Sequence, residues 1–114
     1  MALKEVNANA PPLHEMGESP GRRNFLGIAA QILESCRQGA RRTHVLYRAN
    51  LSFQQLNKYT KLLEAQNLLR YDADSRKYKI TEWGLTYLVE YRELESASWT
   101  YFVKKRALLE MLNR

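Results

Sequence analysis

The chain has 114 residues, of which 45% are hydrophobic, and carries a formal net charge of +6. This length fits one domain with appendages, and the hydrophobic fraction is ordinary for a chain that buries a core. There is no run of about 20 apolar residues, so no membrane span is expected. The layout of a secretory signal is missing from the opening residues, and a single cysteine cannot form an intrachain disulfide. We therefore expect a cytoplasmic protein.

The positive charge is concentrated in the middle of the chain. Residues 22–82 contain twelve Lys and Arg against five Asp and Glu, which gives +7, whereas residues 1–21 sum to −2 and residues 83–114 to +1. Such a basic segment is typical of a unit that binds a polyanion, above all nucleic acid. Residues 1–21 hold three prolines and two glycines without sustained periodicity, which indicates a flexible arm. We expect a core over 22–82 and a helix over 83–114.

Two helices are predicted before residue 50. From 24 to 38 apolar residues recur at helical spacing, and Gly39 is placed to end that helix. Cys36 lies on its apolar stripe and is interpreted as a small core residue. A short helix over 44–49 follows, with Thr43 as its cap. Arg41 and Arg42 beside a helix start suit a phosphate, although a solvated loop is an equally good interpretation.

The stretch 50–67 contains the best-marked helix. Ser52 and Gln55 form a capping box, and Leu51 and Leu56 form the matching hydrophobic staple. At 100° per residue the apolar face gathers Phe53, Leu56, Tyr59, Thr60 and Leu63.

The opposite arc of this helix carries amides and amines without an acid; its members are Gln54, Asn57, Lys58 and Lys61. Such side chains bond base edges and phosphates. On an isolated helix a merely solvated face would be the better interpretation. The short turn Ala49–Leu51 and the preceding helix, however, complete a helix-turn-helix pattern.

A β-hairpin is predicted after this helix. Residues 68–72 and 76–80 alternate between apolar and polar side chains and flank a turn at 73–75. Its tip and return strand carry Arg76, Lys77 and Lys79. A two-stranded hairpin needs a partner surface, and a helix-turn-helix with such a hairpin is a winged helix.

The last segment begins at Thr81, which can cap a helix. Its apolar seam has spacings of three and four residues and continues beyond Ser96–Ser98, so a helix of about 30 residues would be roughly 45 Å long. That exceeds what a small core covers, and a second copy of the chain is the simplest partner. A break at Ser96–Ser98 is the alternative. The expected dimerisation residues are Leu88, Tyr91, Trp99, Phe102, Leu109 and Leu112. Packing is favoured over a ligand pocket for Trp83, Tyr87 and Trp99, and any small-molecule effector stays unknown.

Residues 25–94 resemble the archaeal winged helix-turn-helix family of small DNA-binding proteins. The match rests on Gly39 and Thr43, the segments Asn50–Phe53 and Leu68–Leu69, and the run from Tyr78 to Gly84. Asn67 stands where such proteins usually have glycine, and asparagine also tolerates a positive φ. The resemblance implies a mainly α fold with a small β-hairpin, followed by a C-terminal helix that pairs as an antiparallel coiled coil in a homodimer.

Two functions are compatible with these patterns. The first is a homodimer that binds double-stranded DNA, sequence-specifically or as an architectural protein of the nucleoid, and regulates transcription. The second is a winged helix used as a protein-interaction module, which the +7 of residues 22–82 disfavours because protein interfaces are depleted in lysine. No enzyme, metal or cofactor is expected, since the two histidines are far apart in sequence and no phosphate-binding loop is present. The predicted DNA contacts are Arg41, Arg42, Thr43, Ser52, Gln54, Asn57, Lys58, Lys61, Arg76, Lys77 and Lys79.

Overall fold

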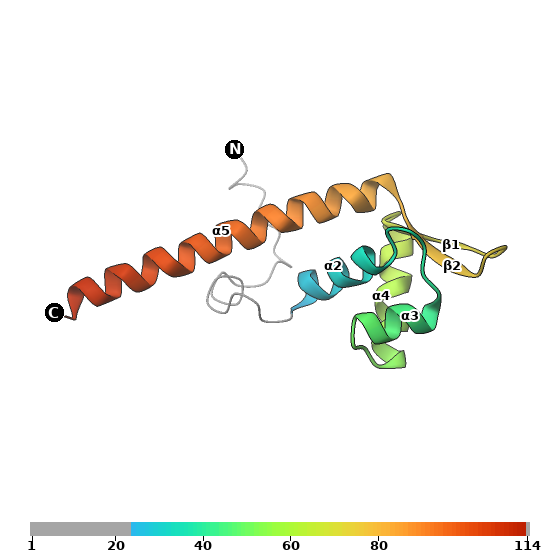
Figure 1. The fold of residues 1–114 in the computed structure, drawn as a ribbon, viewed down its shortest axis with the longest axis horizontal. Helices are drawn as coiled ribbons and strands as arrows, with labels where there is room; N and C mark the ends of the chain where they lie inside the picture. Colours follow the sequence, from blue (N-terminus) through green and yellow to red (C-terminus); the bar gives the residue numbers. More distant parts are fainter. Residues whose placement is uncertain (1–23, 114) are drawn as a thin grey trace. The chain divides into compact units, whose positions relative to one another are not determined.

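The structure is a computed structural model that describes residues 24–113. Over these residues it is mainly α-helical with one antiparallel two-stranded sheet, which confirms the predicted fold class (Figure 1). The predicted arm at 1–21 lies outside the described residues. The elements in chain order are α2 (Phe25–Ser35), α3 (Arg42–Arg48), α4 (Phe53–Ala65), β1 (Leu69–Asp72), β2 (Lys77–Ile80) and α5 (Glu82–Leu112).

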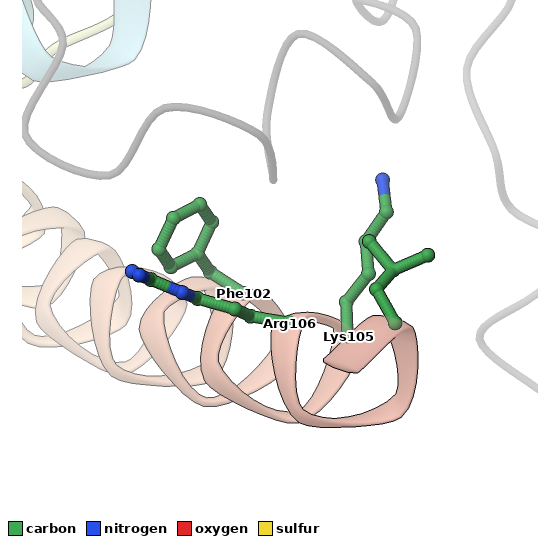
Figure 2. Close-up of a pocket in the computed structure, with 4 residues that line it drawn as sticks. Phe102, Lys105 and Arg106 are labelled. Atoms are coloured by element: carbon green, nitrogen blue, oxygen red, sulfur yellow. The ribbon is translucent and has the colours of Figure 1, made fainter. Parts of the chain in front are cut away.

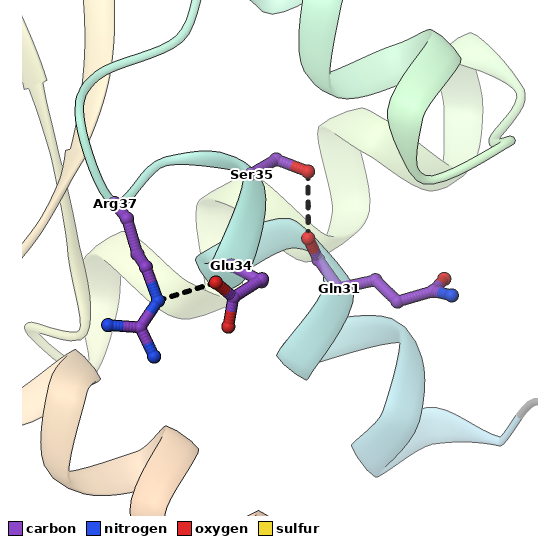
Figure 3. A network of polar contacts seen from close by, with 4 residues as sticks. All are labelled: Gln31, Glu34, Ser35 and Arg37. Carbon is purple, nitrogen blue, oxygen red and sulfur yellow. Dashed lines mark hydrogen bonds and ion pairs between the residues drawn. The ribbon is translucent and has the colours of Figure 1, made fainter.

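Helix α2 begins one residue later and ends earlier than expected. Asn24 is its cap, and its side chain accepts a hydrogen bond from the Gly27 N–H at 2.8 Å. At the other end the Ser35 hydroxyl donates to the Gln31 carbonyl at 2.8 Å, and Arg37 pairs with Glu34 (Figure 3). Residues 36–38 form turns after the helix, and the chain then passes through Gly39 at φ 87°.

Cys36 is a core residue, as predicted. Its side chain is fully buried, and this burial raises the pKa of the thiol to about 12. The thiol therefore stays protonated and acts as a small apolar group.

The start of α3 corrects one prediction. Arg41, not Thr43, occupies the cap position, and Thr43 lies within the helix with an exposed side chain. The cause is a contact distant in sequence, because Ala40 and Tyr78 exchange two backbone hydrogen bonds of 2.9 and 2.8 Å. This bridge keeps the chain extended up to Arg41, and the helix begins directly after it.

Helix α4 has the predicted capping box. The Gln55 N–H donates to the Ser52 hydroxyl oxygen at 3.1 Å, and the Ser52 N–H donates to the Gln55 amide oxygen at 3.0 Å. The members of the apolar arc are buried with one exception: Phe53 is 60% exposed, which corrects its expected place in the core. Asn67 ends the segment at φ 63°, the positive value anticipated for this position.

The hairpin is confirmed, and its register pairs Leu69 with Ile80 and Tyr71 with Tyr78. Leu69 and Tyr78 are buried, whereas Tyr71 is half exposed although its ring centroid lies 5.0 Å from that of Tyr78. The hairpin therefore contacts the core with one face only, through Leu69 and Tyr78. Its tip extends beyond that contact.

Helix α5 is one continuous helix from Glu82 to Leu112, without the alternative break at Ser96–Ser98. The Thr81 hydroxyl oxygen caps it by accepting from the Gly84 N–H at 2.9 Å. No helix within residues 24–113 is long and apolar enough to cross a membrane.

The first turns of α5 belong to the compact unit Arg23–Glu93, which is the winged-helix unit of the chain. The Tyr87 hydroxyl donates to the Leu26 carbonyl at 2.9 Å, and burial, followed by the nearby Tyr91 and Tyr59, raises the pKa of Tyr87 to about 12. Leu88 is 5% exposed and part of the core cluster. This corrects its expected place at a dimer seam, since its side chain is already covered by the core of its own chain.

Candidate nucleic-acid interface

The polar arc of α4 consists of Gln54, Asn57, Lys58 and Lys61, and all four side chains are exposed. They lie opposite Leu56 and Leu63, which are buried in the core. The arc thus presents two amides and two ammonium groups to the surrounding solvent. Amides can donate to and accept from an adenine edge, while ammonium groups bind phosphates or guanine.

Ser52 serves first as the helix cap. Its oxygen accepts the Gln55 N–H, and this bond determines where α4 begins. The hydroxyl hydrogen can still donate to a phosphate at the helix start. Ser52 is therefore a positioning residue for the arc as well as a predicted backbone contact.

The two arginines at the start of α3 are in different surroundings. Arg41 is exposed, whereas Arg42 is half-buried and its Nη1 donates to the Tyr78 hydroxyl at 3.4 Å. Together with the Ala40–Tyr78 bridge, this contact ties the start of α3 to strand β2 of the hairpin. Arg41 and Thr43 are the more accessible members of this group.

The basic residues of the hairpin also differ among themselves. Arg76 lies at the tip with φ 58° and is exposed, while Lys77 and Lys79 are half-buried. The Lys79 amine lies 3.3 Å from an Asp72 carboxylate oxygen. A hydrogen bond from Ser75, then the one from Lys79, lowers the pKa of Asp72, so this acid offsets part of the charge of Lys79.

Arg70 and Arg48 are exposed arginines that the predicted DNA contacts do not include. Arg70 lies on β1 directly opposite Lys79, and Arg48 is the last residue of α3. The position of Arg70 opposite Lys79 depends on the hairpin register, which no local pattern at Arg70 reveals. Like charges directly opposite each other in a sheet are destabilising, and the ion pair of Lys79 with Asp72 offsets part of this cost for the Arg70–Lys79 pair.

Backbone contacts hold the three basic surfaces in one compact unit. Helix α4 leads directly into the hairpin, because the Leu68 N–H donates to the Leu63 carbonyl at 2.9 Å. The hairpin in turn contacts the start of α3 through Tyr78. The polar arc, the start of α3 and the hairpin are therefore parts of a single folded unit. Within residues 24–113 no group of three or more His, Cys, Asp or Glu side chains could hold a metal ion.

The part of α5 from Leu94 onward is a separate unit rich in exposed apolar side chains. Trp99 and Phe102 stack with ring centroids 5.8 Å apart, and Leu109 is 51% exposed. Phe102, Lys105, Arg106 and Leu109 line a hollow of about 440 Å³ (Figure 2). Leu112 is exposed as well, and of the predicted seam only Leu88 and the half-buried Tyr91 belong to the winged-helix unit.

A helix-turn-helix with a β-hairpin packed beside it defines a winged helix. Here α3 and α4 form the helix-turn-helix, and β1 and β2 form the hairpin. The winged helix-turn-helix family matches residues 22–98, and the chain belongs to this family. The structure is similar to that of Sso10a-2, a DNA-binding protein from Sulfolobus solfataricus, with a TM-score of 0.74 and 24% sequence identity. The similarity covers 79% of this chain and 97% of that one, and it concerns the fold. The comparison with curated proteins gives no match.

Proposed function

We propose that this protein binds double-stranded DNA through the winged-helix unit, with α4 in the major groove. The observation that carries the proposal is the polar arc: Gln54, Asn57, Lys58 and Lys61 are exposed together on the face opposite the core. In helix-turn-helix proteins the second helix presents such a face to base edges. Membership of the family and the description of Sso10a-2 as DNA-binding support the same conclusion.

The contacts divide by chemistry into two kinds. Gln54 and Asn57 suit bases, because an amide can form two hydrogen bonds with one adenine. Arg41, Thr43 and Ser52 at the helix starts, and the basic residues of the hairpin, suit phosphates, which position the protein without reading sequence. Arg42 is better described as a link between α3 and the hairpin that also adds positive charge.

We further propose a homodimer formed through the unit of α5 that begins at Leu94. Exposed apolar side chains such as Trp99, Leu109 and Leu112 occupy this stretch, and a contiguous apolar surface on a helix marks a protein contact. A second copy supplies the same stripe, as the resemblance to coiled-coil dimers of this family implies. Two DNA-binding units per particle would suit a nucleoid-associated regulator or an architectural protein.

The alternative of a protein-interaction module has one observation in its favour, the exposed aromatic ring of Tyr47 on α3, which is 80% accessible. A protein-interaction module accounts poorly for a helix face with two lysines, since lysine is depleted at protein interfaces. The salt dependence of duplex binding distinguishes the two functions.

We expect duplex affinity to fall steeply with salt. If the dimer neutralises roughly six to ten phosphates, the slope of log K against log salt is about −5 to −9. Arg41→Ala and Lys77→Ala should each flatten it by about one unit for every phosphate that is no longer neutralised. Fluorescence anisotropy with one duplex at several salt concentrations measures this. Arg37→Ala is the control, because Arg37 pairs with Glu34 on α2 and should leave the slope unchanged. A slope near zero would show that the basic residues do not face DNA.

Asn57→Ala should weaken binding to a preferred site by about 1–3 kcal/mol, with little change on random duplex. Asn57 lies one turn into α4, at the edge of the polar arc that borders Phe53, and we expect its amide to reach base edges more deeply than a phosphate contact does. Lys58→Ala is the matched control and should weaken both duplexes together. The measurement is competitive titration of selected and random duplexes. Equal losses of affinity on both for Asn57→Ala would argue for an architectural binder instead.

A further inference from the structure

Phe53 is the one side chain of the predicted apolar arc of α4 that the core does not cover. It is 60% exposed, whereas Leu56, Tyr59, Thr60 and Leu63 are buried. The helical positions explain the difference: at 100° per residue Phe53 falls between buried Thr60 and exposed Asn57, at the edge of the apolar face. In the first turn of the helix this edge lies outside the core.

The phenyl ring borders the polar arc. Asn57 is four residues after Phe53, so the two side chains are neighbours on the helix surface, and Gln54 is adjacent in sequence. The first turns of α4 therefore combine one large apolar group with two amides. The ring adds an accessible apolar surface of 60% exposure directly beside these amides.

The major groove contains one apolar feature that matches such a ring. Thymine alone among the four bases presents a methyl group, on C5, and phenylalanine is a suitable apolar contact for it. Adenine, its pairing partner, presents the donor and acceptor that an amide reads. An A·T-containing step thus offers partners to the phenyl ring and to the amide together.

We propose that Phe53 is a specificity-determining residue that contacts the C5 methyl group of a thymine in the major groove, beside the adenine read by the amides of α4. This inference rests on the proposed DNA binding. It adds a preference for thymine that hydrogen bonding from the polar arc does not supply. Arginine and lysine contacts with phosphates are indifferent to this methyl group, so the preference has a signature of its own.

The test compares thymine with deoxyuridine, which lacks only the methyl group. A duplex selected by the wild-type protein from a random pool is synthesised in both forms, and the dissociation constants are measured by titration. We expect the uracil duplex to bind about fourfold more weakly for each contacted thymine, the factor that corresponds to one buried methyl-sized group. Phe53→Ala should bind both duplexes equally, and Phe53→Leu should keep a preference for thymine.

Tyr47→Ala is the matched control. Tyr47 is also an exposed aromatic residue, but it lies on α3 and outside the polar arc, so its removal should leave the fourfold ratio intact. Thermal unfolding of each variant checks the fold, which an exposed side chain should disturb little. The proposal is overturned if the wild type binds both duplexes equally, if Phe53→Ala keeps the full ratio, or if the selected sites contain no thymine.

The outcomes separate this inference from the proposed function. Salt-dependent binding without discrimination between thymine and uracil would remove the role of Phe53 and leave DNA binding standing. Absence of salt-dependent binding to any duplex would overturn both.

Discussion

Replacing Gly84 with alanine should lower the free energy of unfolding of the winged-helix unit by about 2 kcal/mol. Gly84 is buried in the first turn of α5, and a Cβ added there would lie 2.6 Å from Cγ1 of Ile80. The backbone oxygen of Leu68 would be closer still, and it already accepts the Thr81 N–H at 3.2 Å. A backbone atom cannot rotate away, so the junction between hairpin and helix must shift.

This clash outweighs the better helix propensity of alanine, which is worth about 1 kcal/mol. A loss of about 2 kcal/mol corresponds to a fall in melting temperature of roughly 10 °C for a domain of this size. Gly27→Ala is the control, since its added Cβ would meet the hydroxyl end of the Tyr91 side chain at 2.9 Å. That side chain can move, and we expect a change within about 1 kcal/mol. Equal melting temperatures for Gly84→Ala and wild type would contradict the close packing at this junction.

Local sequence signals predicted most of the fold because they act over a few residues. The Ser52–Gln55 capping box, the positive φ at Asn67 and the alternation in the hairpin each depend on neighbours within one turn or one strand. The start of α3 was predicted wrongly for the opposite reason. It depends on the Ala40–Tyr78 bridge, whose partners are far apart in the sequence, so no local pattern at Thr43 reveals it.

Helical periodicity predicted which side chains of α4 are exposed, but not where its apolar face ends. An arc of side chains has edges, and whether Phe53 is covered depends on how far the neighbouring helices extend along α4. Leu88 shows the same difficulty on α5: an apolar stripe does not say whether its own core or a second chain covers it. Arg70 is an exposed cation whose place became evident only once β1 and β2 were paired in register.

Ending the chain after Glu95 should convert the protein from a dimer into a monomer and reduce its affinity for a two-site duplex by about 10²–10⁴. The truncated chain retains the whole compact unit Arg23–Glu93, so its fold should persist. It lacks Trp99, Phe102 and Leu109, the apolar side chains proposed to form the interface. A monomer contacts half as many phosphates, and its salt slope should fall to roughly −3 to −5.

Leu109→Glu tests the same interface within the full-length chain. In the dimer, a carboxylate at this position would be buried at the seam without a positively charged partner. In a monomer it would face solvent beside Lys105 and Arg106. The variant should therefore fold but sediment as a monomer at tens of micromolar, and bind DNA like the truncated chain. Ala107→Glu places the same charge on the opposite face of α5, because two residues correspond to about 200° around the helix, and should leave the dimer intact. A wild-type protein that sediments as a monomer at these concentrations would exclude this interface, and the exposed apolar side chains of α5 would then need a different partner.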